Sequence, residues 1–322
     1  MQHPDLSIII VNWNSKDYVR KCLQSVYANT HGLPFEIIVV DGASYDGCGE
    51  MLAREFPEAR FIQCEKNVGF AKANNLGFEP SQGDCVLFLN PDTEVVGPAI
   101  NVLRDALLNL KDAGIVGARL LNTDGSVQTS CIQTFPTIFN QVLDADLLRQ
   151  AFPRLSFWGT APLFGAGAEP VEVQVLTGAC MMMQRAVFDK IGRFGAEYFM
   201  YSEDLDLCYK SRQFGCKNYH VPNAVIIHHG GGSSQQSRSE FSTVMMRESV
   251  YRFLTKVRGK WYGAGFRASL GLSAIGRLGL LLLVFPFRII QGEVTSARNS
   301  IRKWIAILKW VLGLESWIGN YH

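Results

Sequence analysis

The sequence predicts an α/β protein with a mostly parallel central sheet and flanking helices. Short β-branched runs alternate with helical segments through the first 120 residues. The apolar residues of these runs are consecutive, which is typical of parallel strands covered on both faces. With 322 residues and 48 % hydrophobic content, the chain can bury a sizeable core and still carry an appendage. We therefore expect ligands at the carboxyl ends of the strands.

The expected elements follow the chain in order. Strands are predicted over 6–11, 36–40, 60–63, 85–89 and 114–118, and helices over 16–27, 47–55, 70–79 and 97–110. Residues 121–170 are rich in Pro, Gly and Phe and indicate an irregular insertion. Strand character returns over 171–184 and 217–228, a helix is expected over 202–214, and a Gly/Ser/Gln loop covers 230–239.

The composition changes near residue 240. Residues 241–322 carry 12 Lys/Arg against 3 Asp/Glu, a net charge of +9, which leaves −7 of the overall +2 on residues 1–240. This asymmetry predicts a main domain over 1–240 and a basic, amphipathic helical region over 241–322. An anionic membrane surface is the favoured partner of that region, although basic segments also bind nucleic acid.

Within this region, residues 269–287 are apolar and long enough to reach across much of a hydrocarbon core. Arg277 near the middle of the stretch costs about 2.5–3.5 kcal/mol on insertion, so spanning is disfavoured. The tryptophans are typical of an interfacial helix among headgroups, and they stand at Trp261, Trp304, Trp310 and Trp317. The alternative is that these helices pack on the main domain or on a second subunit.

The cysteines and the N-terminus indicate an intracellular protein. The eight cysteines form no CxxC pair and no Cys/His cluster at zinc spacing, so we interpret them as reduced core residues. The first 15 residues contain Asp5 and only a short apolar run, unlike a signal peptide. We therefore expect a cytoplasmic location.

Polar residues follow the first two predicted strands, in SIIIVNWN and IIVVDGAS. At such a position Asp41 can accept a hydrogen bond from a ring N–H of a nucleobase; the alternative is that it caps the next helix. The run KNVGFAKANN contains Gly69, which lets backbone approach a ligand, and Lys72, which can contact phosphates. An ordinary glycine turn with a solvated Lys72 is the alternative.

A third polar turn, Asn90-Pro91-Asp92, follows the buried strand predicted over 85–89. Mg²⁺ and Mn²⁺ prefer oxygen ligands and bind through one or two carboxylates plus substrate phosphates. Asp92 is therefore a candidate ligand for the metal of a nucleotide diphosphate. A type I turn with Pro91 at its second position is the structural alternative.

Three acids, Glu203, Asp204 and Asp206, stand at the start of a predicted helix. Their mutual repulsion would raise the proton affinity of one of them, as suits a general base, although first-turn acids also serve as simple caps. Further on, His228 and His229 precede a glycine run. One of them can complete a metal shell, while a structural histidine is the alternative.

The chain resembles the family-2 glycosyltransferases of the rhamnosyltransferase-like subgroup, which builds bacterial O-antigen and other cell-surface polysaccharides. The resemblance covers about residues 5–240 and rests on seven segments in order: SIIIVNWNS, VVDGAS, KNVGFAKANN, FLNPDT, TGACMMMQR, FMYSEDLDLCYKSRQFG and HHGGGSS. It implies a GT-A fold, a divalent cation (Mg²⁺ or Mn²⁺) and an inverting single displacement.

The resemblance also implies roles for individual residues. Asp204 corresponds to the base that deprotonates the acceptor hydroxyl, with Glu203 beside it in the ED motif, and His228 corresponds to a metal-binding histidine. Asn90 stands where the family motif has its first acid, which leaves Asp92 as the sole carboxylate there. The donor-binding positions are Val11, Asn12, Asp41, Lys72, Asn90 and Asp92, and the metal-binding positions are Asp92 and His228.

The expected reaction transfers L-rhamnose from dTDP-rhamnose to a lipid-linked saccharide at the cytoplasmic face of the inner membrane, where the protein is peripheral. A UDP-hexose donor and a non-catalytic, membrane-tethered sugar-nucleotide-binding protein are the alternatives. A dinucleotide-dependent oxidoreductase is disfavoured because residues 12–15 lack the GxGxxG pattern. No nucleic-acid partner is expected, and a homo-oligomer through the C-terminal helices stays open.

Overall fold

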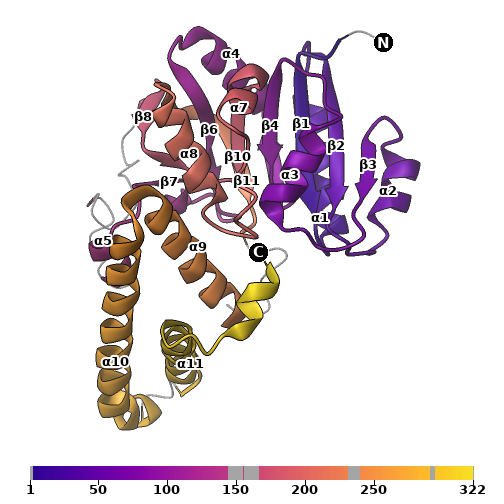
Figure 1. The fold of residues 1–322 in the computed structure, drawn as a ribbon. Helices are drawn as coiled ribbons and strands as arrows, with labels where there is room; N and C mark the ends of the chain where they lie inside the picture. The colour runs from indigo at the N-terminus through magenta and orange to yellow at the C-terminus, as the bar shows by residue number, and fades with distance from the viewer. Residues whose placement is uncertain (1–2, 144–154, 156–166, 231–239, 291–293, 322) are drawn as a thin grey trace.

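The computed structural model describes residues 3–143, 155, 167–230, 240–290 and 294–321, and its centre is a nine-stranded mixed sheet (Figure 1). Its strands are β1 Leu6–Asn12, β2 Phe35–Asp41, β3 Arg60–Gln63, β4 Cys85–Leu89, β5 Thr93–Val96, β6 Ala113–Leu121, β8 Val171–Val173, β10 Cys180–Gln184 and β11 Lys217–His228. The order is β3-β2-β1-β4-β10-β6-β11-β5, with β8 paired to β11. Strands β3, β2, β1 and β4 are parallel, whereas β10 is antiparallel to both of its neighbours.

The helices lie around this sheet and beyond it. They are α1 Lys16–Asn29, α2 Cys48–Glu55, α3 Phe70–Phe78, α4 Ala99–Asn109, α5 Ile138–Val142, α7 Arg185–Lys190, α8 Glu203–Gln213, α9 Glu240–Arg258, α10 Lys260–Ile290 and α11 Val294–Val311. Two 3₁₀ turns, η1 Thr129–Cys131 and η3 Ser316–Tyr321, and a small second sheet of β7 Ile132–Gln133 with β9 Val175–Leu176 complete the described residues.

Helices cover both faces of the parallel strands, which explains their consecutive apolar residues. Ile38 and Val40 of β2 pack against Ala73 of α3, while Ile37 and Val39 on the opposite face belong to the main core. The predicted α/β class is confirmed. All nine strands and helices expected before residue 120 are present, each within a few residues of its predicted ends.

The register of the sheet gathers strand ends at one edge. Asn12 at the end of β1 lies opposite Asp41 at the end of β2. Strand β10 starts at the same edge, where Cys180 pairs with Leu89 and the Asn90 N–H donates to the Ala179 carbonyl at 2.9 Å. The carboxyl edge of the parallel strands is therefore continued by the start of β10.

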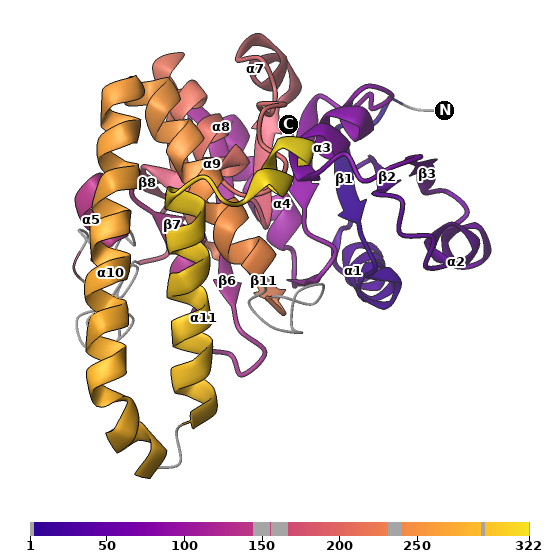
Figure 2. The same ribbon diagram turned by 60° about the horizontal axis from the view of Figure 1, so that its bottom comes forward.

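The three long C-terminal helices pack against one another, and α10 and α11 extend away from the sheet (Figures 1 and 2). Trp304 and Trp310 are only 5 % and 1 % exposed, and Trp317 stacks on Phe241 with ring centroids 5.2 Å apart. The expectation that Trp304 and Trp310 lie among headgroups is wrong for this structure, because packing between the helices buries their rings, whereas Trp317 is partly buried. Trp261, by contrast, is 91 % exposed.

Several short elements were not predicted, among them α5 and β7 in the segment expected to be irregular, and two predicted segments are only partly described. Strand β5 was missed, since it has only four residues and its partner is β11, more than 120 positions later in the chain. Helix α7 was missed as well. Of the insertion over 121–170 and the loop over 230–239, residues 144–154, 156–166 and 231–239 lie outside the described residues.

Candidate active site

The carboxylate of Asp41 is held at the end of β2 by several donors. Asn12 Nδ2 donates to Oδ1 at 2.7 Å, and the Ser44 N–H and Gln63 Nε2 donate to Oδ2 at 3.0 and 2.6 Å. Burial raises the pKa of Asp41, but the hydrogen bonds from Ser44, Gln63 and Asn12 together lower it by more. Helix α2 begins only after Gly47, which gives no side-chain cap. Asp41 is therefore not the N-cap of this helix.

Asp46, which the sequence analysis did not select, fixes the loop between β2 and α2. Its Oδ2 accepts from the Lys16 N–H at 2.8 Å, and its Oδ1 accepts from the Cys48 N–H at 3.1 Å. These are the first residues of α1 and α2, whose N–H groups have no partner within the helices. One carboxylate thus joins both helices to the strand ends.

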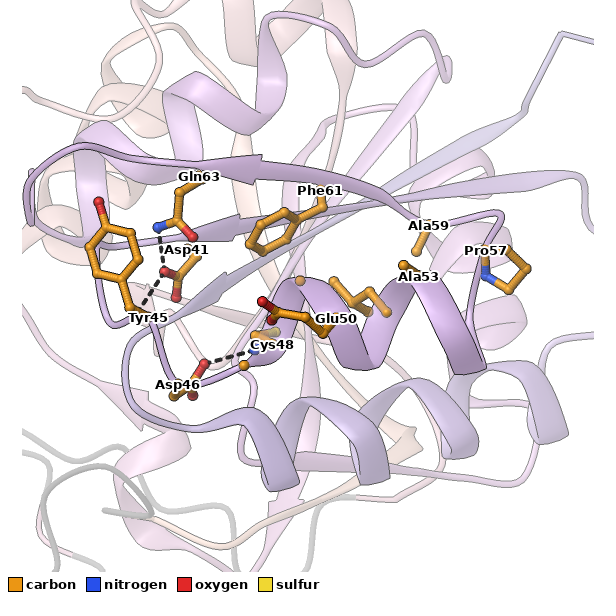
Figure 3. Close-up of a pocket in the computed structure, with 13 residues that line it drawn as sticks. Asp41, Tyr45, Asp46, Cys48, Glu50, Ala53, Pro57, Ala59, Phe61 and Gln63 are labelled. Atoms are coloured by element: carbon orange, nitrogen blue, oxygen red, sulfur yellow. Dashed lines mark hydrogen bonds between the residues drawn. The ribbon is translucent and has the colours of Figure 1, made fainter.

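A cavity of about 580 Å³ opens between α2 and the edge strand β3, next to Asp41 (Figure 3). Gln63 and Tyr45 lie at its polar end, and Phe61, Ala53 and Pro57 lie towards the other end. Ligand pockets are commonly this large and combine apolar walls with a few polar groups.

Backbone strain is concentrated at the same edge. Asn14, Ala43 and Tyr45, in the loops after β1 and β2, have φ values of 51°, 62° and 51°. Tyr201 and Ser202, directly before α8, have φ values of 69° and 62°. Left-handed conformations of residues other than glycine cost energy and are found mainly at functional sites.

Asp92 and His228 meet where β4 and β11 end. Asp92 is 7 % exposed, and its Oδ1 lies 3.3 Å from His228 Nε2. The other ring nitrogen, Nδ1, lies 2.8 Å from Gln128 Oε1, an acceptor, so Nδ1 carries a proton and Nε2 is the ring nitrogen that faces Asp92. In the same turn, Asn90 Oδ1 is buried with no hydrogen-bond partner among the described residues.

This donor set suits a divalent cation whose remaining ligands come from elsewhere. A carboxylate oxygen and a neutral imidazole nitrogen are both ligands of Mn²⁺, and the orphaned amide oxygen of Asn90 adds a further hard donor to the turn. The described residues contain no group of three or more His, Cys, Asp or Glu that could hold a metal by themselves. Phosphate oxygens of a donor would therefore have to complete the shell.

The N–H of His229 donates to the Asp92 carbonyl oxygen at 2.9 Å, but its side chain has other partners. Its Nε2 is 2.7 Å from Glu94 Oε1, and its ring packs on Tyr18 with centroids 5.5 Å apart.

The three acids of α8 have different surroundings. Asp204 Oδ2 accepts from the Gly178 N–H at 3.0 Å, and burial raises its pKa against the lowering effect of such backbone donors. Glu203 is 8 % exposed, its Oε2 has no hydrogen-bond partner among the described residues, and burial followed by the charge of Asp204 raises its pKa. Asp206 is fully buried and binds Lys256 Nζ at 2.6 Å. Asp204 is the most accessible of the three.

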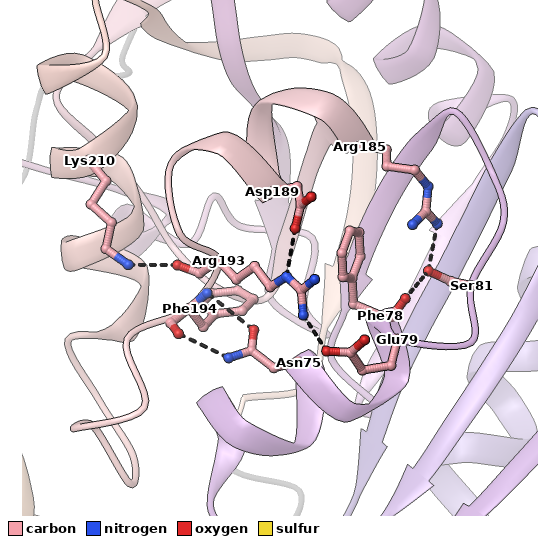
Figure 4. Close-up of polar contacts among 9 residues, drawn as sticks. All are labelled: Asn75, Phe78, Glu79, Ser81, Arg185, Asp189, Arg193, Phe194 and Lys210. Atoms are coloured by element: carbon pink, nitrogen blue, oxygen red, sulfur yellow. Dashed lines mark hydrogen bonds and ion pairs between the residues drawn. The ribbon is translucent and has the colours of Figure 1, made fainter.

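Helix α3 holds the loop that leads into α8. Asn75 Nδ2 donates to the Phe194 carbonyl at 2.9 Å, and the Phe194 N–H donates back to Asn75 Oδ1 at 3.2 Å (Figure 4). A Cβ on Gly69, whose φ is +83°, would lie 2.3 Å from the Phe199 carbonyl oxygen. The close approach that requires a glycine at position 69 is therefore made by the loop that carries Phe199.

Two other selected residues lie near this helix. Lys72 of α3 is half-buried and forms no hydrogen bond or ion pair within the described part of the chain, so its ammonium group is available to an anion. The side chain of Val11 packs in the small apolar cluster with Val40 and Ala73. Val11 is only partly buried there, so part of its side chain stays accessible at the end of β1.

The structure brings most of the selected residues to one edge of the sheet. Gly178 and Ala179 connect Asp204 to Asn90, because Gly178 donates to Asp204 and Ala179 accepts from Asn90. On the same edge, Asn12 lies at the end of β1, one strand beyond β4, and Asp41 lies at the end of β2, two strands beyond β4. Sequence reasoning missed Asp46, Gln63, Gln128 and Lys256, whose positions become informative only through tertiary contacts.

Comparisons with known proteins identify the family of this chain. Residues 7–192 match the family model of glycosyl transferase family 2. The N-acetylglucosaminyl-diphospho-decaprenol L-rhamnosyltransferase of Mycobacterium tuberculosis (strain ATCC 25618 / H37Rv) is 29 % identical over 278 residues, which cover 82 % of this chain and 89 % of the relative. The rhamnosyltransferase WbbL of Escherichia coli (strain K12) is 22 % identical over 262 residues, covering 78 % and 93 %.

Two solved structures share the fold. The mannosyltransferase PcManGT of Pyrobaculum calidifontis, in complex with GDP-Man and Mn²⁺, superposes with a TM-score of 0.57 at 15 % identity, covering 98 % of this chain and 89 % of that one. GalNAc-T7 with UDP, GalNAc and Mn²⁺ gives a TM-score of 0.57 at 16 % identity, covering 80 % of this chain but only 51 % of that one. The fold is therefore the GT-A fold that the resemblance implied.

Proposed function

Because this chain belongs to glycosyl transferase family 2, we propose that it is an inverting enzyme that moves L-rhamnose from dTDP-rhamnose to a lipid-linked saccharide during cell-surface polysaccharide synthesis. The M. tuberculosis relative described above is named as an L-rhamnosyltransferase of N-acetylglucosaminyl-diphospho-decaprenol, and this name supports both the sugar and the lipid-linked acceptor. A UDP-hexose donor is the second candidate.

The observation that carries the proposal is that a short series of hydrogen-bonded and adjacent residues connects the candidate base, Asp204, to the candidate metal ligands, Asp92 and His228. Asp204 is 3.0 Å from the Gly178 N–H, and the next residue, Ala179, accepts from the Asn90 N–H at 2.9 Å. Asp92, two positions beyond Asn90, lies 3.3 Å from His228. An acceptor hydroxyl at Asp204 and a donor diphosphate at Asp92 would thus be neighbours.

In the proposed reaction, Asp204 takes the proton from the acceptor hydroxyl as its oxygen bonds to the anomeric carbon. The bond from this carbon to the diphosphate oxygen breaks on the opposite face, which inverts the configuration. Asp92 and His228 would hold Mg²⁺ or Mn²⁺, and the bound cation would neutralise the charge that develops on the leaving oxygen. Asn12 and Asp41 bind the nucleoside end, and Lys72 supplies a positive charge near the phosphates.

The decisive experiment is a donor panel. Full-length protein is incubated with Mn²⁺, a polyprenyl-diphosphate-linked saccharide and each of dTDP-rhamnose, UDP-glucose, UDP-N-acetylglucosamine and GDP-mannose. We expect acceptor-dependent release of nucleoside diphosphate, fastest with dTDP-rhamnose, and a product of inverted anomeric configuration by NMR. A retained configuration, or no release with any donor, contradicts the proposal.

We also propose that the C-terminal region holds the enzyme on the cytoplasmic leaflet of the inner membrane as a peripheral protein. Helix α10 exposes an apolar surface, and the side chains of this surface that are more than half exposed are Leu272, Ile275, Leu280, Leu282, Leu283 and Phe287. Among the described residues, Lys260–Phe285 is also the one helix long and apolar enough to cross a bilayer. The net charge of +9 over 241–322 suits anionic headgroups.

The neighbours of Arg277 favour lying on the membrane over crossing it. Its guanidinium donates to the Val142 and Leu143 carbonyls at 3.3 and 3.2 Å and stacks over Trp304 at 4.7 Å. The charge of Arg277 therefore faces the protein, and the exposed large side chains between Leu272 and Phe287 are apolar.

A further inference from the structure

The helix that carries Asp204 begins without a side-chain cap. Ser202, directly before α8, has φ 62° and ψ −1°, and its side chain makes no capping hydrogen bond. Its hydroxyl is buried with no hydrogen-bond partner among the described residues. Tyr201 also has a left-handed backbone, with φ 69°. A serine at this position usually has extended backbone and caps the helix with its hydroxyl, so other contacts must maintain the conformation found here.

The two residues before this strained pair are held through their carbonyl groups. The Phe199 carbonyl accepts from the Phe70 N–H at 2.8 Å, and the Met200 carbonyl accepts from the Ser249 hydroxyl at 2.8 Å. The ring of Phe199 is buried, and a Cβ on Gly69 would lie 2.7 Å from its Cδ2. The packing of this ring therefore decides where the loop before α8 can lie.

Two aromatic residues of η3 complete the packing around Phe199. Tyr321 meets the Phe199 ring edge-on, with centroids 4.6 Å apart. Phe241, at the start of α9, lies 5.2 Å from Tyr321 and stacks on Trp317 at 5.2 Å. We call these four residues the aromatic cluster. The turn η3 follows α11 and returns towards the sheet (Figure 1), so it reaches the loop before α8 from far along the chain.

Removing a ring of η3 would give Phe199 room to move. The backbone of Tyr201 and Ser202 could then relax to a conformation that costs less energy, because left-handed backbone persists only where its surroundings enforce it. Such a relaxation would turn the first helical turn of α8. Asp204, whose carboxylate is 3.0 Å from the Gly178 N–H, would lose this position.

We propose that Trp317 and Tyr321 are positioning residues for Asp204. They act through Phe199, whose packed ring keeps Tyr201 and Ser202 in their strained conformation. This inference rests on the proposed role of Asp204 as the base, and it adds η3 to the parts of the chain that the reaction requires.

The test compares four variants with the unmodified full-length protein. Tyr321→Ala and Trp317→Ala each remove one ring of η3, whereas Tyr321→Phe keeps the ring and removes only its hydroxyl. Phe214→Ala is the matched control, since it removes a 51 % exposed ring at the other end of α8. The measurements are kcat and the acceptor KM with dTDP-rhamnose and a polyprenyl-diphosphate-linked saccharide, and the affinity for dTDP by calorimetry with Mn²⁺.

We expect Tyr321→Ala and Trp317→Ala to lower kcat at least about tenfold, because a misplacement of about 1 Å can cost about 10² in rate. The acceptor KM and the affinity for dTDP should change less than about twofold. Tyr321→Phe and Phe214→Ala should keep the kcat of the unmodified protein.

Hydrogen exchange gives a readout that needs no substrate. The backbone amides of residues 199–205 should exchange at least about tenfold faster in Tyr321→Ala, whereas those of β1 should keep their rate, because only the loop before α8 is released. If the unmodified protein transfers no sugar, the proposed function fails. Exchange at 199–205 then still decides whether η3 holds this loop.

Three results would overturn the inference. An unchanged kcat in both alanine variants removes η3 from the positioning of Asp204. A raised acceptor KM with unchanged kcat would mean that the rings contact the acceptor instead. Exchange that accelerates equally in β1 and in 199–205 would assign η3 to the stability of the whole fold.

Discussion

At the scale of single residues, three acids within the first turn of α8 have three different environments. Asp206 has a lysine on each side, Asp204 has backbone donors and partial access to solvent, and Glu203 has a buried oxygen without a partner. Only Asp204 combines a raised pKa with access to a substrate hydroxyl. Surroundings, and not residue type, therefore select the candidate base.

The first prediction concerns this base. Asp204→Asn should lower kcat by a factor of about 10² or more, because the acceptor hydroxyl loses its proton acceptor. Donor affinity, measured by calorimetry with dTDP-rhamnose, should change little, since the amide is isosteric. Near-normal turnover in this variant would exclude Asp204 as the base.

The second prediction concerns the metal shell. Excess chelator should abolish transfer, and Asp92→Ala and His228→Ala should lose most of the activity. Gln128→Leu should raise the Mn²⁺ concentration for half-maximal activity about tenfold, because the Nδ1 hydrogen bond that orients His228 is lost. His229→Ala is the matched control and should leave the Mn²⁺ requirement unchanged, as this residue contacts Glu94. Full activity in chelator would remove the metal from the reaction.

The third prediction concerns His220, a buried histidine outside the site. It is 0 % exposed, and neither ring nitrogen has a hydrogen-bond partner among the described residues. Burial, assisted by Arg119, lowers its pKa from 6.5 to about 4. Between these values the unfolded chain binds a proton that the folded chain does not, so this residue makes stability fall as the pH is lowered from about 6.5 towards 4.

The slope from one such group is at most about 1.4 kcal/mol per pH unit. Urea unfolding at pH 7 and pH 5 should show a loss of stability that is smaller in His220→Leu. The exposed His31 provides a control, and His31→Leu should keep the loss of the unmodified protein. An equal loss in all three proteins would mean that His220 does not titrate on unfolding.

At the scale of elements, the loop before α8 is fixed from two sides. Helix α3 binds it through Asn75 and Gly69, and α9 binds it through Ser249, whose hydroxyl donates to the Met200 carbonyl at 2.8 Å. Lys256 of α9 also bridges Glu197 and the buried Asp206 at 2.7 and 2.6 Å. The C-terminal region therefore supports the candidate base as well as extending from the domain.

The fourth prediction tests this support. In Lys256→Met, Lys210 is the one remaining ion-pair partner of Asp206 among the described residues. We expect the free energy of unfolding to fall by about 1–3 kcal/mol. This is less than the loss for a fully broken buried ion pair, because Lys210 remains. Lys256→Arg should recover most of it. Lys260→Met, at an exposed position of α10, should unfold at the same urea concentration as the unmodified protein. Equal stability of Lys256→Met and Lys260→Met would show that the bridge is not needed.

The sequence predicted the elements whose signal is local. We could recognise the apolar runs of β1, β2 and β4 and the polar turns that end them. A strand that is buried on both faces has apolar residues at consecutive positions, and this pattern is visible in the sequence. β5 and Gln128 were not recognisable. Each is positioned by a contact with β11, about 100 or more positions later in the chain, and a local sequence pattern cannot reveal a contact at that separation.

At the scale of the whole molecule, charge and apolar surface are separated. The basic region projects beyond the sheet as α10 and α11 (Figure 2), and its buried side, which includes Trp304, Trp310 and Arg267, is occupied by contacts between helices. Helix α9 buries Phe253 and Leu254 and pairs with Asp206. A chain cut near residue 240 would expose these contacts, so point variants on the outer surface of α10 are the better probe of membrane binding.

The fifth prediction uses such variants. Full-length protein should float with anionic liposomes, and high salt should weaken flotation without abolishing it, because apolar burial is not screened. Leu272 and Leu283 are 72 % and 75 % exposed, and burying one leucine contributes about 1.5–3 kcal/mol. The double variant Leu272→Lys/Leu283→Lys should therefore lower the partition coefficient at least about tenfold, even though it adds two positive charges. Leu108→Lys, at a 48 % exposed position of α4, should float like the unmodified protein. Two results together would contradict membrane binding: protein that stays at the bottom of the gradient, and a concentration-dependent dimer in light scattering that the double variant does not form. They would assign the apolar surface of α10 to a second copy of the chain. The proposal of a lipid-linked acceptor would then lose its main support.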